Sequence, residues 1–322
     1  MTGARQIRVL VASLLAGLLA GCSGGAAPSV GRTPSFAPPR PVGVQDPAQI
    51  PSAPAGPAPT CDVRHSSLRP EPGNSASGPT LAKIRERGRL VVGVDQNTYL
   101  FGYRDPATGQ IVGFDIDVVR EIAAAIFGNP NAIQFTAISS AQRIPTVQSG
   151  QVDLVADTMT ITCERLQQVA FSTDYFDAGQ RVLVLRDSTV TGIGDLGGKK
   201  VCAAAGSTSI RNIAAAASRP IPVSVADWTD CMVLLQQGQI AAISTDDTIL
   251  LGMAAQDPNT KLVGERFTDE PYGLAVHKNA NDLLRFVNGV LERMRSDGTW
   301  ARIYATWLPG QVPAPPPAGY RD

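Results

Sequence analysis

Short apolar runs alternate with amphipathic segments along the chain from residue 81 to residue 308. Apolar runs bounded by glycine or polar residues predict buried strands, and apolar residues at helical spacing predict helices. In the first half, these elements are expected at 81–88, 89–94, 118–126, 133–137, 142–150, 152–155 and 164–169. In the second half, they are expected at 180–185, 200–205, 210–217, 221–225, 231–237, 240–244, 271–276, 283–295 and 300–307.

The alternation of strand and helix predicts an α/β protein whose sheet is parallel and covered on both faces. With 322 residues, of which 43% are hydrophobic, the chain is long enough for two lobes. The strand at 180–185 can leave the first lobe, and 271–276 can lead back to it. We therefore expect one lobe from 81–182 and 275–308, and a second lobe from 183–274.

The ends of the chain have a different pattern. Arg5 and Arg8 precede an apolar run that ends at Cys22, which resembles a bacterial lipoprotein signal peptide over 1–21 with Cys22 as the lipidated residue. The alternative is an uncleaved anchor helix, but the apolar run is short for a transmembrane span. Residues 22–80 are rich in proline, alanine and glycine, which predicts a tether, and 309–322 form a second proline-rich end.

Charge and cysteine content narrow the function classes. Lys+Arg 28 balance Asp+Glu 28, so there is no basic excess for nucleic acid. Export would place the four cysteines after Cys22 in an oxidising compartment, where we expect the pairs Cys202–Cys231 and Cys61–Cys163. A zinc site is the competing interpretation, but His65 and His277 are the only histidines and there is no Cys-x-x-Cys spacing.

A dinucleotide or phosphate cofactor is not expected either. The segment 192–197 fits Gly-x-Gly-x-x-Gly, but it leads into a strand instead of opening a helix after one. The chain has no Gly-x-x-x-x-Gly-Lys-Ser/Thr phosphate loop. We therefore expect no metal and no cofactor.

The stretch 156–165 is the strongest candidate for a binding site. It follows the strand 152–155 and combines hydroxyls, helix-start N–H groups and the Arg165 guanidinium, which suit a carboxylate. A second cluster, 206–209, follows the strand 200–205 in the same way. An ordinary capped helix is the alternative interpretation of each cluster.

Several segments together resemble the bacterial extracellular solute-binding proteins of the polar amino-acid family, which are receptors of amino-acid ABC importers. The matching segments, in the family's order, are 89–94, 113–117, 144–153, 158–165, 171–172, 206–208 and 246–247. The resemblance covers roughly 81–308 and implies a type II periplasmic-binding-protein-like fold, in which two crossing strands form the hinge and the lobes close on one amino acid.

The resemblance also assigns roles within the cleft. Arg165 is expected to bind the ligand α-carboxylate, helped by Thr160 and by Thr208, with Ser207 beside it in the second lobe. The α-ammonium is expected at Thr158 and Asp246. Aromatic cover would come from Tyr99 or Phe101 in the loop after the first strand, although Tyr99 could equally be a surface contact.

The resemblance leaves the ligand side chain less certain. Ser140 and Arg143 are similar to residues that bind a side-chain carboxylate in acidic-ligand relatives, so glutamate or aspartate fits best. Asp157 and Asp95 depart from that pattern. If either enters the cleft and pairs with Arg143, the site becomes neutral and favours glutamine or asparagine. A solvated Arg143 is the third alternative.

The expected function is therefore capture of an amino acid by a monomer that is lipid-anchored on the extracytoplasmic face of the membrane and serves an ABC permease. A transmembrane sensor is the alternative partner. A dehydratase-type enzyme on the same fold is a less favoured alternative, with Glu164 or Asp157 as its acid or base, because the Thr158, Thr160, Arg165 and Asp246 set describes a binding protein.

Overall fold

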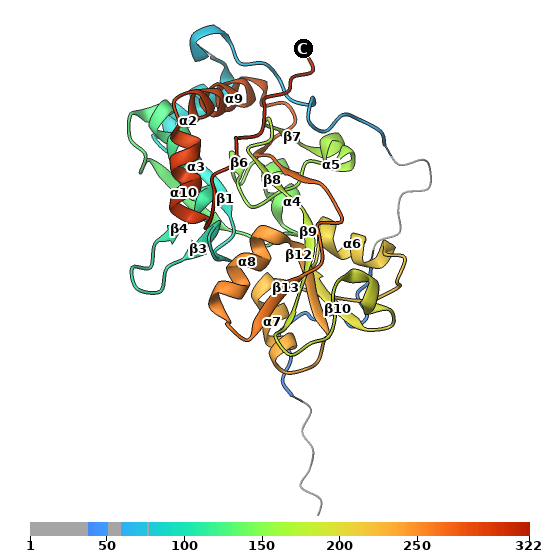
Figure 1. Cartoon of the computed structure of the whole chain (residues 1–322). Coiled ribbons are helices and arrows are strands. Elements are labelled where there is room, and N and C mark those ends of the chain that lie inside the picture. Colours follow the sequence, from blue (N-terminus) through green and yellow to red (C-terminus); the bar gives the residue numbers. More distant parts are fainter. Residues whose placement is uncertain (1–37, 51–58, 76) are drawn as a thin grey trace, which may run out of the picture. The chain divides into compact units, whose positions relative to one another are not determined.

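The computed structural model describes residues 38–50, 59–75 and 77–322. The expected signal peptide, Cys22 and much of the expected tether lie outside these residues. The chain divides into the units Met1–Pro39 and Arg40–Asp322, and the helices and strands of the described ranges belong to the second unit (Figure 1). Within these ranges, no helix is long and apolar enough to cross a membrane.

The first lobe is built on a five-stranded sheet in the order β5-β1-β6-β15-β7. Its strands are β1 (Leu90–Val94), β5 (Ile133–Ala137), β6 (Leu154–Val155), β7 (Ala170–Phe171) and β15 (Ala275–Val276). β1 is parallel to β5 and β6, whereas β15 is antiparallel to both of its neighbours. The sheet is therefore mixed, and not wholly parallel as the sequence predicted, because β15 enters from the second lobe.

Both faces of this sheet are covered, as predicted. Successive side chains of a strand point to opposite faces, and Leu90, Val92 and Val94 join one apolar core while Val91 joins another. Helices contribute to both cores. The helices of this lobe are α2 (Pro79–Arg87), α3 (Phe114–Phe127), α4 (Arg143–Gln148), α5 (Cys163–Gln168), α9 (Asn281–Ser296) and α10 (Thr299–Trp307).

Three short strands form a small sheet that the apolar pattern did not predict. They are β2 (Asn97–Thr98), β3 (Gly102–Arg104) and β4 (Ile111–Val112), paired in that order. β2 contacts helices α7 and α8 of the second lobe, so this part of the first lobe borders the space between the lobes. A short 3-10 helix, η1 (Pro72–Asn74), packs against α9.

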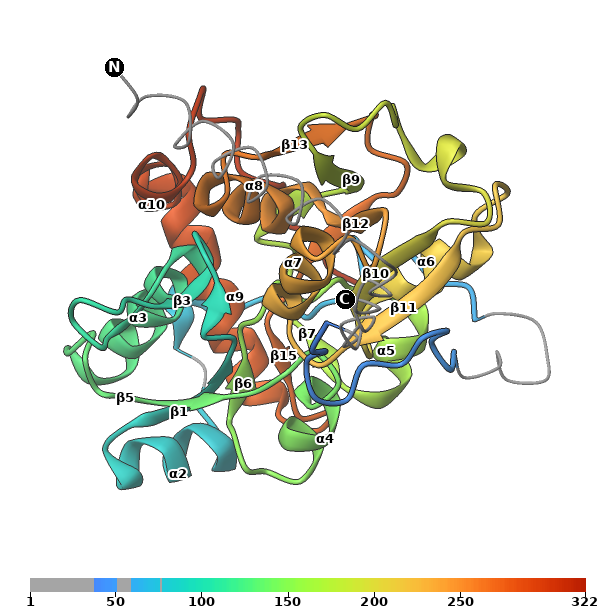
Figure 2. The same cartoon turned by 90° about the horizontal axis from the view of Figure 1, so that it is seen from below.

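The second lobe has its own five-stranded sheet, in the order β11-β10-β12-β9-β13 (Figure 2). Its strands are β9 (Gln180–Leu185), β10 (Lys200–Ala204), β11 (Ile221–Val225), β12 (Ala242–Asp246) and β13 (Thr260–Val263), and its helices are η2 (Ile193–Leu196), α6 (Thr208–Ala215), α7 (Trp228–Gln236) and α8 (Asp247–Gln256). β9 runs antiparallel to both of its neighbours, β12 and β13. The pattern missed α8, whose apolar residues are not confined to one face.

Two antiparallel strands connect the lobes, namely β8 (Phe176–Ala178) and β14 (Glu270–Tyr272). β8 is followed after Gly179 by β9 of the second sheet, and β14 precedes β15 of the first sheet. The sequence predicted a single strand over 271–276, but Gly273 and Leu274 separate β14 from β15. The paired strands form the crossing hinge of a two-lobe α/β fold.

Residues 40–50 pack against the second lobe. Gln45 pairs with Ser224 of β11 through two backbone hydrogen bonds, and Asp46 bridges Arg40 and Lys200. Figure 2 shows this blue segment beside β11. Part of the segment expected to be tether is therefore held on the second lobe by a β-bridge at the free edge of β11.

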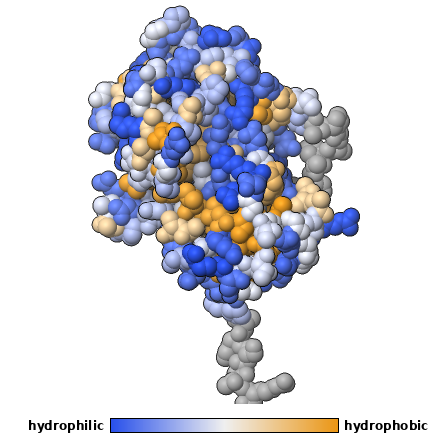
Figure 3. Space-filling view, in the orientation of Figure 1, coloured by the Kyte–Doolittle hydropathy of each residue, from blue (hydrophilic) through white to orange (hydrophobic). Residues whose placement is uncertain are grey.

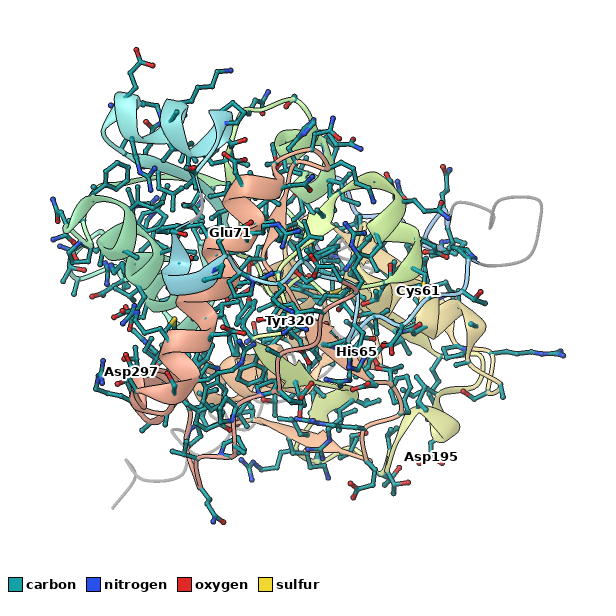
Figure 4. The ribbon with its side chains drawn as sticks, turned by 90° about the horizontal axis from the view of Figure 1, so that it is seen from above. Cys61, His65, Glu71, Asp195, Asp297 and Tyr320 are labelled. Atoms are coloured by element: carbon teal, nitrogen blue, oxygen red, sulfur yellow. A yellow bond between two sulfur atoms is a disulfide. The ribbon has the colours of Figure 1, made fainter. Side chains whose placement is uncertain are left out.

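Both predicted disulfides are present. Cys61–Cys163 joins the incoming chain to the start of α5, and Cys202–Cys231 joins β10 to α7 inside the second core. The C-terminal segment lies beside the same incoming chain, where Ser67 and Tyr320 form a β-bridge. His65 and Tyr320 lie close together in Figure 4.

Candidate functional site

The strand ends of the first lobe place the stretch 156–165 at the side that faces the second lobe. Thr158 lies in this stretch with a φ of +40°, which is unusual for a β-branched residue. The Thr158 N–H donates to Asp115 Oδ2 (2.9 Å), and Tyr175 donates to Asp115 Oδ1 (2.6 Å). Asp115 therefore holds Thr158 in a strained conformation, and such strain is typical of ligand sites.

Arg143 is buried at the start of α4 and is held by backbone carbonyls. Its Nε donates to Ser140 O (3.1 Å) and its Nη1 donates to Asp157 O (2.9 Å). The residue is only 3% exposed, so Arg143 is not the solvated helix residue considered as an alternative. Ser140, also buried, contributes its carbonyl to this arrangement.

Arg165 spans the two lobes. Its Nη1 donates to Thr160 O (2.8 Å) in its own lobe, and its Nη2 donates to Gly206 O (3.2 Å) in the second lobe. Burial, together with the charges of Arg143 and Arg211, lowers the pKa of Arg165 to about 9. A buried cation in this setting is stabilised by an anion, so a ligand carboxylate would suit it.

The second lobe brings the end of β10 to the same place. Gly206 has a φ of +78°, and a side chain there would lie 2.7 Å from the Cα of Ala141 in the first lobe. Only glycine fits this conformation and this close approach. The contact brings the first turn of α6 against the first lobe, and its N–H groups are donors for an anion.

The hydroxyls of the second lobe have partners within the protein. Ser207 caps α6 by accepting from the Ile210 N–H, and Thr208 donates to Glu270 Oε2 (2.9 Å). Glu270 lies on the crossing strand β14. The Ser207 N–H and hydroxyl both donate to Ala204 O, so a contact of this pair with an anion would come from the Thr208 backbone N–H.

Asp246 ends β12 and is 3% exposed. Tyr272 donates to its Oδ2 (2.6 Å), whereas its Oδ1 is buried without a partner among the described residues. Burial raises the pKa of Asp246 to about 8, and the nearby Glu270 acts in the same direction. An ammonium group at Oδ1 would complete the hydrogen bonding and favour the charged carboxylate.

Asp157 has the least satisfied side chain of this region. Both of its carboxylate oxygens and the Thr158 hydroxyl are buried without a hydrogen-bond partner in the part of the chain that the structure describes. Burial raises the pKa of Asp157 well above its ordinary value, although Arg143 opposes this. Buried polar groups in native proteins are normally paired, so these atoms indicate a place for a ligand.

The remaining sequence candidates lie in the loop after β1. Asp95 is buried and accepts from Gln96 N, Asn97 N and the Thr98 hydroxyl, so its carboxylate orders the turn. Tyr99 is half-buried, and its ring meets Tyr103 edge-on. Phe101 is fully buried and packs with other aromatic rings of the first core. Phe101 therefore occupies a core position, away from the role of ligand cover.

Three hollows adjoin these elements. One, of about 270 Å³, is lined by Ser140, Arg143, Arg165 and Gly206 among others, which is small for a ligand pocket. Another, of about 520 Å³, includes Thr160 and Thr208 in its lining. The third, of about 370 Å³, lies by the crossing strands, is lined largely by apolar residues and contains none of the predicted ligand residues. Figure 3 shows apolar surface on this side of the molecule.

Several residues of the site were not singled out by the sequence. Asp115, Tyr272 and Glu270 position Thr158, Asp246 and Thr208 through their hydrogen bonds. Tyr175 in turn donates to Asp115 and fixes that carboxylate. Trp228 begins α7, and its indole N–H is also buried without a partner among the described residues. Across the described ranges, no group of three or more histidine, cysteine or acidic residues could hold a metal ion.

Comparison with known proteins gives the family. Residues 90–310 match the bacterial extracellular solute-binding proteins, family 3. The ABC transporter glutamine-binding protein GlnH of Bacillus subtilis is 42% identical over 71% of this chain and 84% of its own length. The glutamate-binding protein GluB of Corynebacterium glutamicum is 30% identical over 72% of this chain and 82% of its own length.

A solved structure gives the same result for the fold. An ancestral arginine-binding protein bound to glutamine is 38% identical, with a TM-score of 0.65, over 69% of this chain and 98% of that chain. The match extends through both lobes, since the family region begins at β1 and ends after α10. The chain belongs to the bacterial extracellular solute-binding proteins, family 3.

Proposed function

We propose that this protein captures one α-amino acid of the glutamine, glutamate and aspartate group between its lobes and delivers it to an ABC importer. The observation that carries this proposal is that Arg165 of one lobe lies close enough to Asp246 of the other to feel its charge. Arg165 is a buried cation suited to an α-carboxylate, and Asp246 is a buried carboxylate whose Oδ1 has no partner among the described residues and suits an α-ammonium.

Closure supplies the mechanism. The first lobe offers Arg165 and the Thr158 hydroxyl, which has no partner among the described residues, so the amino acid docks there. Movement about β8 and β14 then brings the N-terminus of α6 and Asp246 onto it. The closed form gains contacts that the open form lacks, and this differential affinity shifts the equilibrium toward closure.

The names of the relatives support both the group of ligands and the delivery to an ABC importer. The relatives bind glutamine or glutamate, and one of them is named as part of an ABC transporter. The family is extracellular, which supports a location outside the cytoplasm. We further propose attachment to the membrane through a lipid on Cys22, action as a single copy, and a binding role without catalysis.

Isothermal titration of the full chain in mild detergent tests this function. Glutamine, asparagine, glutamate and aspartate are titrated in turn, and X-ray scattering follows the radius of gyration. We expect at least one ligand to bind with Kd of about 0.1 to 10 μM and to reduce the radius of gyration. The absence of binding by all four would refute the proposal.

A further inference from the structure

The Asp157 carboxylate differs from the other buried carboxylates beside it. Asp115 accepts from Thr158 and Tyr175, and Asp95 accepts from three donors in its own turn. Asp157 is 2% exposed and neither of its oxygens has a donor among the described residues. The charges that act on it belong to Arg143, Asp95, Asp115 and Arg165, so its carboxylate lies amid the residues of the binding region.

The neighbouring Arg143 is fixed but not neutralised. Its hydrogen bonds go to the carbonyls of Ser140, Asp157 and Thr158, and it forms no ion pair within the described ranges. Nη2 takes part in none of these hydrogen bonds. Arg143 also lines the hollow that Arg165 borders. Arg143 is anchored on the backbone of Asp157 and keeps donors that form no hydrogen bond to those carbonyls. The Asp157 carboxylate, an acceptor without a partner among the described residues, therefore lies next to these donors.

We infer that Asp157 and Arg143 together recognise a carboxamide at the end of the ligand side chain, so that the protein selects glutamine or asparagine over glutamate and aspartate. This inference rests on the proposed function, in which Arg165 and Asp246 bind the α-carboxylate and the α-ammonium. A carboxamide is neutral and carries both a donor and an acceptor. Its NH₂ group donates to Asp157, and its oxygen accepts from Arg143.

Charge balance separates the competing ligand classes. An acidic side chain would satisfy Arg143 but would place a second carboxylate beside buried Asp157. A cationic side chain would satisfy Asp157 but would meet the Arg143 guanidinium. In both cases like charges come together away from water, where their repulsion is strong. The neutral amide avoids both contacts, and a site built for its N–H donors discriminates against an analogue without them.

The test is a selectivity ratio measured on Asp157→Asn, a nearly isosteric change. The full chain is titrated with glutamine, asparagine, glutamate and aspartate at pH 7. We expect the wild type to bind its preferred amide at least tenfold more tightly than the corresponding acid. In Asp157→Asn that ratio should fall at least tenfold, because the variant loses the carboxylate that repels an acid and gains an amide that can donate to it.

The matched control is Asp187→Asn, which removes the same charge from an exposed position and should leave the ratio unchanged. Circular dichroism and thermal melting confirm that each variant folds. A wild type that prefers glutamate or aspartate would overturn the inference, and so would an Asp157→Asn variant with an unchanged ratio, although the proposed function would survive both results. If none of the four amino acids binds, the proposed function fails and this inference fails with it.

Discussion

The two lobes contribute to the binding region in different ways. The first lobe has a charged surface that is arranged in advance, because Asp115 holds the strained Thr158 and backbone carbonyls hold Arg143 and Arg165. In the second lobe, the Thr208 hydroxyl is already bonded to Glu270, and Asp246 Oδ1 has no hydrogen-bond partner in the part of the chain that the structure describes. This difference indicates that the first lobe selects the ligand, and that the second lobe closes over the ligand once it is bound.

Among the variants that test this difference between the lobes, Arg165→Ala should weaken ligand binding the most. The change removes the α-carboxylate partner together with the buried bond to Gly206 of the second lobe. Loss of one partner of a buried charged contact costs about 2 to 5 kcal/mol, so we expect Kd to rise at least 30-fold by the ~1.4 kcal/mol per tenfold relation. Isothermal titration with the preferred ligand measures the change.

Arg211→Ala is the control for this variant. Arg211 also connects the lobes, through Glu164 of the first lobe, but the two side chains are 43% and 40% exposed. Exposed ion pairs contribute about 0 to 1 kcal/mol, so Kd should change no more than about fivefold. Equal losses in the two variants would mean that Arg165 acts as an interlobe tie and does not bind the carboxylate.

Gly252→Ala should cause the next largest rise in Kd. This change acts on the closure of the lobes and not on a ligand contact. Gly252 lies in α8, and a Cβ there would be 2.4 Å from the backbone oxygen of Tyr99 in the first lobe. Alanine is a better helix former than glycine, so α8 itself should not be weakened. Overpacking of such a contact costs about 1 to 3 kcal/mol, and we expect Kd to rise about tenfold.

X-ray scattering distinguishes closure from ligand contact in this variant. With saturating ligand, the radius of gyration of Gly252→Ala should exceed that of the wild type, because the added Cβ opposes full closure. The matched control is Gly194→Ala in η2, where a Cβ would have no neighbour within 4 Å, and which should behave as the wild type. A Gly252→Ala protein that binds and closes normally would show that the Tyr99 contact does not limit closure.

The sequence predicted those parts of the fold that local patterning determines. The ranges 133–137 and 180–185 correspond to β5 and β9, since the first alternates apolar and polar residues and the second contains an apolar run that ends at Arg186. The two-lobe α/β class was also correct. The mixed pairing of both sheets could not be predicted, because β15, β9 and β13 take their direction from the crossing strands and not from their own residues.

The clustering of the candidate site residues was predictable where one segment supplies several groups. Thr158, Thr160 and Arg165 follow one strand, so the order of residues brought them together. The partner of Thr208 was not predictable, because Glu270 is 62 residues away along the chain. The sequence favoured an acidic ligand on the strength of Arg143 and left an amide open if Asp157 enters the cleft. Its spacing did not reveal that the Asp157 carboxylate would be buried without a partner among the described residues.

The smallest predicted effect is a dependence of affinity on pH that comes from the second lobe. Asp246 must be ionised to pair with an ammonium, but in the ligand-free protein burial and Glu270 raise its pKa to about 8. A carboxyl with a raised folded-state pKa binds its proton more tightly in the folded than in the unfolded protein. The ligand-free protein should therefore lose the corresponding stability as the pH rises from about 4, the ordinary pKa, to about 8.

Ligand binding should show the opposite trend, because a bound ammonium favours the ionised form of Asp246. We expect the affinity to increase about fivefold between pH 7 and pH 8, which corresponds to about 1 kcal/mol, and the melting temperature gained on ligand addition to increase with it. Titration calorimetry and thermal melting at several pH values measure both trends. Asp246→Asn should bind more weakly and lose this pH dependence, whereas an unchanged dependence in the variant would assign it to another group, such as Asp157. The second lobe would then close over the ligand without sensing its charge.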